Sequence, residues 1–252
     1  MQPKIIFIII QVASIQFLCA QNRNILFEQA LLYKKVNQVD KALSCFEMLL
    51  KSDSSNIQYL CNASIFYSKK GNEFADKQTR LNYFNKAYYL ARKSLVISSN
   101  FPESHYCMAL AMGRMNEFAS TKTKISNAKE IKLHIDETLK LNPMHAGAYH
   151  LLGRWHRTMA GFNTLDKLLI SSFYGGVPKG YSYDASVKAF RKAIAFEPFY
   201  KLHQYELAQT FFEMGKPIEA LFWFKKALAI SSKNKIDLLI DNHCKKALIE
   251  LQ

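Results

Sequence analysis

The chain has 252 residues, of which 49% are hydrophobic, and a formal net charge of +14 at pH 7. Its apolar content, with 18 Phe and 13 Tyr, excludes a disordered chain. Nine Gly and six Pro are too few for a sandwich or barrel built on many tight turns, so an all-α fold is expected. The excess positive charge predicts attraction to phosphates, acidic peptides or anionic lipid surfaces.

Residues 1–20 have the pattern of a secretory signal peptide. Lys4 precedes an apolar run from Ile5 to Leu18, and a polar stretch follows Ala20. The run is short for a membrane span, which needs about 20 apolar residues. We therefore expect cleavage after Ala20 and export to a periplasm or to the extracellular space. The alternative is an uncleaved N-terminal membrane anchor.

Four cysteines remain beyond that segment, at positions 45, 61, 107 and 244. They are scattered singly with no C-x-x-C pair, so neither a zinc site nor a redox motif is predicted. Burial as small hydrophobic residues is the commoner outcome for cysteines in such positions. A disulfide between Cys45 and Cys61 is the alternative, because an exported chain meets oxidising conditions.

A repeated helical pattern follows, and it is clearest over residues 201–234. Ala208 and Gly215 belong to a first helix, and Ala220, Phe224 and Ala227 to a second. Small residues let the two helices approach closely, and aromatic residues fill the space between them. This is the pattern of a tetratricopeptide unit, a helix–turn–helix of about 34 residues that must stack on similar units.

The rest of the chain divides into units of the same kind. We expect residues 21–252 to form a tetratricopeptide-like α-solenoid, with units near 23–56, 57–101, 102–145, 146–200 and 201–234 and a capping helix over 235–252. Insertions are expected at 73–81 and at 162–181, the second apolar enough to fold against the array. The second helix of the third unit is expected from Asn127 to Leu141, where Asn142 and Pro143 stop it.

Three segments follow one another in order: KISNAKEIKLHI at 124–135, HLLGRW at 150–155, and the apolar insertion that ends in PKGY at 178–181. The first and the third are not features of ordinary repeats. With these, residues 124–230 resemble the repeat domain of the regulator of microtubule dynamics family. The resemblance implies an all-helical, non-catalytic domain, linked to microtubule association and in one branch to organelle contacts and phospholipid binding. The predicted signal peptide would separate this chain from cytoplasmic tubulin, so we expect an exported homologue, for example in a bacterial envelope.

The first helix of each unit lines the concave face of such a stack, and basic side chains recur there. Basic groups that converge on a groove can hold a carboxylate or a phosphate. The expected partner is an acidic protein or peptide or an anionic phospholipid, with a membrane surface as a further option. The alternative is that these are ordinary solvated charges. The predicted groove residues are Lys34, Lys35, Lys69, Arg114, His150, Arg154, Arg157, Tyr205, Gln209 and Phe212.

Aromatic residues in and near the second insertion suggest a different ligand. Trp155, Phe162, Phe173 and Tyr174 could line a cavity for an acyl chain, which would make the chain a lipid-binding or lipid-transfer module. The alternative is that they pack in the core, as aromatic residues at helical spacing usually do.

Motifs for catalysis are missing from the sequence. It contains no H-E-x-x-H, no G-x-S-x-G and no phosphate-cradling glycine loop, so we expect no enzyme activity, no cofactor and no metal. Nucleic acid is not an expected partner either, because export would separate the chain from it. The sequence therefore predicts a binding protein.

Overall fold

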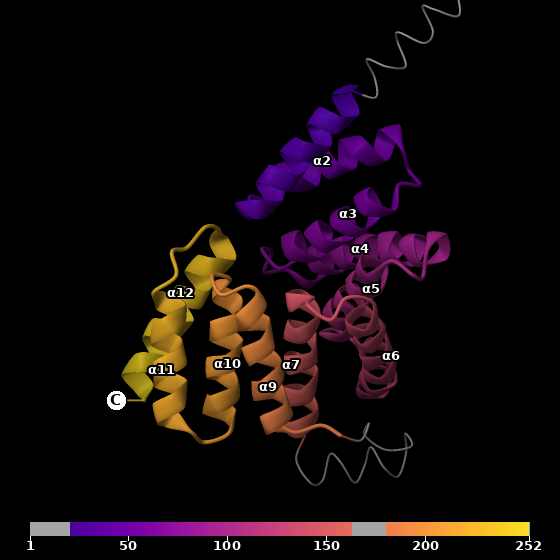
Figure 1. The fold of residues 1–252 in the computed structure, drawn as a ribbon. Helices are drawn as coiled ribbons and strands as arrows, with labels where there is room; N and C mark the ends of the chain where they lie inside the picture. The colour runs from indigo at the N-terminus through magenta and orange to yellow at the C-terminus, as the bar shows by residue number, and fades with distance from the viewer. Residues whose placement is uncertain (1–20, 163–179, 252) are drawn as a thin grey trace, which may run out of the picture.

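A computed structural model describes residues 21–162 and 180–251, and these ranges contain helices and turns with no strand (Figure 1). The predicted all-α solenoid is confirmed. Residues 1–20, where the signal peptide is predicted, and most of the second insertion lie outside the described residues. After a helix over residues 21–35, the helices are α2 (Val39–Ser52), α3 (Ile57–Gly71), α4 (Lys77–Ile97), α5 (Pro102–Asn116), α6 (Thr121–Leu141), α7 (Ala146–Ala160), α9 (Tyr183–Phe196), α10 (Lys201–Glu213), α11 (Pro217–Leu228) and α12 (Lys235–Glu250).

The helices pack as antiparallel pairs that stack side by side. The pairs are helix 21–35 with α2, α3 with α4, α5 with α6, α7 with α9, and α10 with α11. Each first helix from α3 onward also contacts the first helix of the next pair, and α10 contacts α12. Among the described helices, the second helices contact first helices and α12 but not one another. The first helices therefore form the inner, concave layer and the second helices the outer, convex one.

Four of the five pairs are held by an aromatic ring from the second helix that packs where the first helix carries a small residue, and in the α5–α6 pair the fully buried Ile135 of α6 stands in place of a ring. Phe46, Phe84, Phe190 and Phe224 are all fully buried. Ala30 shares a cluster with Phe46, and Ala208 shares one with Phe224. A Cβ atom placed on Gly153 would lie 2.8 Å from the Phe190 ring, so the ring rests against bare backbone. Close approach of this kind sets how tightly the two helices of a pair can pack.

Two helices begin earlier than the sequence suggested. α4 starts at Lys77, inside the expected insertion at 73–81, because the Asp76 carboxylate accepts a hydrogen bond from the Thr79 N–H at 2.7 Å and caps the helix. α6 starts at Thr121, before the expected Asn127, and the Ser120 hydroxyl caps it in the same way. The first turn of each of these helices is polar, so it carries no apolar periodicity from which the start could be predicted.

Other expectations can be compared directly with the helices. Cys45, Cys61, Cys107 and Cys244 are buried and free, so the described residues contain no disulfide between Cys45 and Cys61. None of the described helices combines the length and the apolar composition that crossing a membrane requires.

Two glycines of first helices should respond in opposite ways to the same substitution. Gly153→Ala forces a methyl group into the buried Phe190 ring, and we expect it to destabilise the fold by about 1–3 kcal/mol. Gly113→Ala adds a methyl group with no atom within 4 Å and should stabilise by about 0.5–1 kcal/mol through helix propensity. Urea denaturation of both variants provides the measurement, and equal signs would contradict this packing.

Candidate functional site

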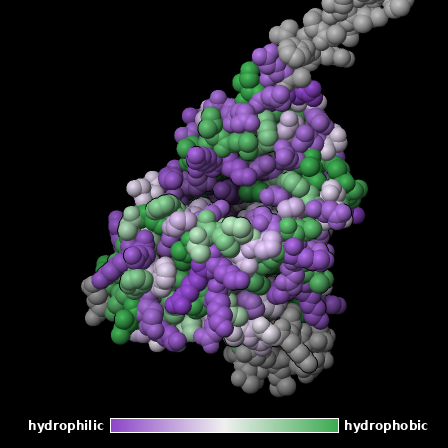
Figure 2. Space-filling view, in the orientation of Figure 1, coloured by the Kyte–Doolittle hydropathy of each residue, from purple (hydrophilic) through white to green (hydrophobic). Residues whose placement is uncertain are grey.

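The stack bends so that its two ends approach across the concave side. In Figure 1 helices α2 to α4 lie above the ends of α7, α9 and α10, and Figure 2 shows a hollow between these two parts of the molecule. The Lys69 Nζ atom of α3 lies 5.8 Å from the centre of the Tyr200 ring, which belongs to the turn between α9 and α10. The hollow therefore has one wall from the N-terminal units and one from the α9–α10 turn.

Two lysines of the N-terminal wall are held by amide oxygens. Lys34 Nζ donates to Asn62 Oδ1 at 2.7 Å, and Lys69 Nζ donates to Asn37 Oδ1 at 3.1 Å. Neither lysine forms an ion pair with any residue that the structure describes. Burial, together with the nearby charge of Lys34, lowers the pKa of Lys69 to about 8. Burial also lowers the pKa of Lys34.

The opposite wall carries an acid, Glu197, which contacts a pair of buried histidines behind it. Glu197 Oε2 lies 3.3 Å from His203 Nε2, and the hydrogen bond from His203 lowers the pKa of Glu197. Because a carboxylate only accepts, His203 donates from Nε2, and its Nδ1 shares a hydrogen bond of 2.9 Å with His150 Nδ1. His150 is buried, and its pKa falls well below the ordinary value because of that burial. The structure thus places His150 inside the stack, packed between α7 and α10, and not on the groove surface where it was predicted.

The three predicted arginines lie together but face carboxylates of the same chain. Arg114 contacts Glu117 at 3.3 Å, and Arg154 contacts Glu206 at 3.6 Å. Arg157 forms ion pairs with Glu206 and with Glu213, the latter at 3.3 Å. Burial favours the neutral form of Glu206, but Arg157 and Arg154 outweigh it and hold the pKa of this carboxyl below its ordinary value. This part of the concave face is therefore close to electrically neutral, not strongly basic as predicted.

The remaining predicted residues lie at the two ends of the concave layer. Lys35 is exposed, next to Lys34. Tyr205 and Gln209 share a hydrogen bond of 3.1 Å, and the Tyr205 hydroxyl lies 3.3 Å from His243 of α12. Phe212 is largely exposed.

Sequence reasoning missed the partners of these basic groups. Asn37 and Asn62 hold the lysines, while Glu117, Glu206 and Glu213 neutralise the arginines. A signal for the arginine partners was available in the sequence. Glu206 and Glu213 lie on α10, which is the first helix of the next pair after α7, and α7 carries Arg154 and Arg157.

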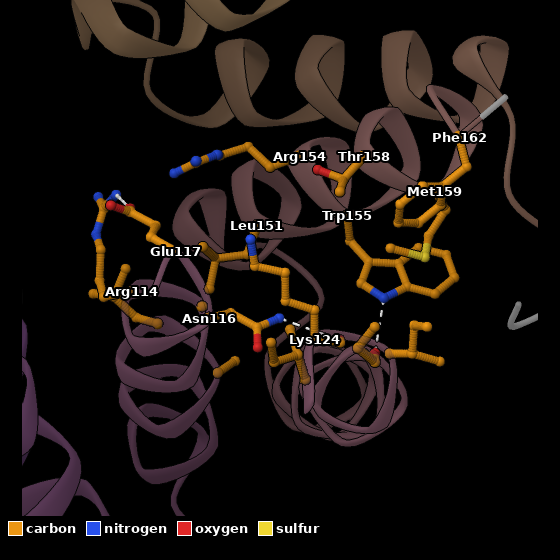
Figure 3. Close-up of a pocket in the computed structure, with 16 residues that line it drawn as sticks. Arg114, Asn116, Glu117, Lys124, Leu151, Arg154, Trp155, Thr158, Met159 and Phe162 are labelled. Atoms are coloured by element: carbon orange, nitrogen blue, oxygen red, sulfur yellow. Dashed lines mark hydrogen bonds and ion pairs between the residues drawn. The ribbon is translucent and has the colours of Figure 1, made fainter. Parts of the chain in front are cut away.

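A second hollow lies within the stack, between α5, α6 and α7 (Figure 3). It has a volume of about 350 Å³, and most of its wall is apolar. Gly113 lines it and contributes no side chain, which leaves open space at that point of α5. In Figure 3 Arg114 and Glu117 stand at one side of this cavity, and Arg154 and Thr158 stand above it.

Two of the four residues predicted for a lipid pocket line this cavity. Trp155 packs in the core, and its indole N–H donates to the Ala128 carbonyl oxygen of α6 at 2.8 Å. Phe162 lines the same cavity at the end of α7. Phe173 and Tyr174 lie outside the described residues, so the other half of that prediction is not placed.

Among the residues that the structure describes, no three His, Cys, Asp or Glu side chains are arranged to bind a metal ion. The two close histidine contacts, His150 with His203 and His105 with His134, are each a pair of rings joined by one hydrogen bond.

The comparison with known proteins decides the family. A family model described as "Regulator of microtubule dynamics protein 1-3" matches residues 26–252. The chain belongs to this family. Regulator of microtubule dynamics protein 1 of Mus musculus is 25% identical over 162 residues, which cover 64% of this chain and 53% of the relative. Regulator of microtubule dynamics protein 2 of Rattus norvegicus is 23% identical over 222 residues, covering 86% and 53%.

The predicted resemblance to the regulator of microtubule dynamics family is thus confirmed, and the chain spans about half the length of the curated relatives it matches. Solved structures agree on the fold. A thermophilic TPR protein of Thermus thermophilus matches with a TM-score of 0.62 at 17% identity, covering 90% of this chain and 99% of that one. PilW, a type IV pilus biogenesis factor, matches with a TM-score of 0.55 at 20% identity, covering 90% and 86%.

Removing the Arg157 side chain should lower the unfolding free energy of the chain, because Arg157 pairs with carboxylates of the same molecule. Arg157→Ala leaves the buried Glu206 with only the longer contact to Arg154, and we expect a loss of about 3 kcal/mol in unfolding free energy at pH 7. The deficit should shrink as the pH falls below about 4.5, because a protonated Glu206 no longer needs the partner. Denaturant unfolding across this pH range is the measurement, with the exposed Arg191→Ala of α9 as control. A variant as stable as the wild type would contradict the ion-pair network.

Proposed function

We propose that this member of the regulator of microtubule dynamics family is a non-catalytic scaffold that binds a segment of a partner protein on its concave face. Lys34 and Lys69 contact an acidic group of that segment. Tetratricopeptide-like stacks bind proteins and peptides on their inner surface, and this chain has that fold. The fold supports the general role, and the arrangement of charges supports the particular contact.

The observation that carries the proposal is the pair of lysines that lack an acidic partner among the described residues. Each ammonium group has three N–H donors and uses one on an asparagine oxygen, so donors remain for a ligand. The arginines deeper in the concave layer already have carboxylate partners. A carboxylate between Lys34 and Lys69 would gain charge-assisted hydrogen bonds, and the partly buried setting strengthens them.

Selection from a random displayed peptide library tests this role. We expect enrichment of peptides rich in Asp and Glu. Lys34→Ala and Lys69→Ala should each weaken the selected peptides about tenfold or more, since a hydrogen bond to a charged group contributes about 1.5–3 kcal/mol. Lys51→Ala, an exposed lysine on α2, is the matched control and should leave affinity unchanged. Selected peptides without acidic residues, or equal losses in all three variants, would refute the proposal.

A pH titration of the same peptides gives a second readout. Affinity should fall as the pH rises through about 8, because Lys69 loses its charge there. Glu197 and Asp237 also lie near this lysine and favour its charged form, which keeps the pKa from falling further. Affinity that stays constant up to pH 10 would contradict a role for Lys69, because only a lysine with an ordinary pKa of about 10.4 would keep its charge to that pH.

A second candidate is a lipid-binding module, and the cavity between α5, α6 and α7 favours it. The cavity has an apolar wall, with Arg114, Lys124 and Arg154 among its lining residues to meet an anionic head group. Native mass spectrometry of the purified chain would then show bound phospholipid, and Gly113→Trp, which fills the cavity from α5, would abolish it. A lipid-free spectrum for both proteins removes this candidate and leaves the peptide role untouched.

A further inference from the structure

The excess positive charge of the chain is concentrated on the outer layer. Of the five second helices, α2 is neutral, with two Lys against one Asp and one Glu, and α4, α6, α9 and α11 together carry fifteen Lys and Arg against five Asp and Glu, a net charge of +10. The first helices (21–35, α3, α5, α7 and α10) carry nine against four. The convex side, not the groove, is therefore the strongly basic surface of this molecule.

The two layers also differ in how these charges are compensated. Within the described residues, five of the nine basic residues on the first helices form ion pairs. On α4, α6, α9 and α11 only Arg80, Lys132 and Lys140 do so, three of the fifteen. Most of the outer cations are thus left without a carboxylate from the described part of this chain and are available to an external anion.

Exposed apolar side chains lie next to these cations on the solvent-facing sides of the second helices. On α4, Tyr89 and Val96 flank Arg92 at spacings of three and four residues, so the three side chains share one face of the helix. On α11, Ile218 and Phe222 precede Lys225 with the same spacing. The four apolar residues keep between 52% and 82% of their surface exposed.

α6 differs from this arrangement, because the exposed Leu133 follows Lys129 by one turn but Glu137 comes one turn after it and pairs with Lys140. α9 contributes the exposed pair Lys188 and Arg191. A basic helix face with protruding aliphatic and aromatic side chains is what lies flat in the head-group region of a bilayer, where the cations meet anionic lipids and the apolar groups enter the acyl boundary.

We propose that the convex face formed by α4, α6, α9 and α11 docks on an anionic lipid membrane. An acidic protein surface would satisfy the cations but leave the protruding Tyr89, Val96, Ile218 and Phe222 without a favourable environment. A bilayer interface accommodates both sets of side chains. In this position the concave face points away from the membrane and stays open, so this docking is independent of peptide binding.

Sedimentation of the full chain with lipid vesicles tests the proposal. We expect binding to phosphatidylcholine vesicles that contain phosphatidylserine, weakening as salt is raised, and no binding to phosphatidylcholine alone. The quadruple variant Lys188→Gln, Arg191→Gln, Lys225→Gln, Lys226→Gln should bind on the order of a hundredfold to a thousandfold more weakly, because each cation near the surface contributes about 1 kcal/mol. All four side chains are exposed, so the variant should keep the stability of the wild type.

The matched control removes the same charge from other surfaces: Lys35→Gln, Lys235→Gln, Lys245→Gln, Lys246→Gln. It should retain most of the vesicle affinity, and equal losses would show an effect of net charge alone and overturn the proposal. Ile218→Ser with Phe222→Ser should weaken vesicle binding while leaving binding to soluble polyglutamate unchanged. Binding to polyglutamate without binding to the anionic vesicles would assign the face to an acidic protein and also overturn the proposal.

Discussion

The close approach of a small residue and an aromatic ring, found in four of the five helix pairs, is the contact on which this structure depends. The Phe190 ring rests where Gly153 has no side chain, and Phe84 lies just as close to Gly71. A ring in that place fixes the crossing of the two helices, and the pair can then bury its remaining apolar face only against a neighbouring pair. Every surface of the molecule follows from that stacking, because it assigns first helices to the inside and second helices to the outside.

This division into layers also separates two kinds of electrostatics. Five of the nine basic side chains on the inner layer meet a carboxylate, as Arg157 meets Glu206, so the arginine cluster of that layer is neutralised while Lys34 and Lys69 are not. The outer helices splay apart and do not contact one another among the described residues, so their lysines and arginines meet few carboxylates. The net charge of the chain therefore describes the convex face more than the groove.

Sequence reasoning succeeded where the information was local or periodic. The all-α class followed from helical spacing and few turn residues, and the end of α6 at Leu141 followed from Asn142 and Pro143. It failed where the information lay between repeats. His150 appeared to face the groove, yet it pairs with His203, which is fifty-three positions further along the chain. The capped starts of α4 and α6 were missed for a different reason, since polar caps carry no apolar period.

Hydrogen–deuterium exchange of the full chain, measured with an acidic peptide and separately with phosphatidylserine vesicles, tests the two-layer account most directly. The peptide should slow exchange in helix 21–35, in α3 and in the α9–α10 turn, where Lys34, Lys69 and Tyr200 lie. The vesicles should slow exchange in the outer helices α4, α6, α9 and α11, and they should leave exchange in helix 21–35, in α3 and in the α9–α10 turn unchanged. Protection of the same helices by both ligands would contradict the assignment of separate inner and outer binding faces.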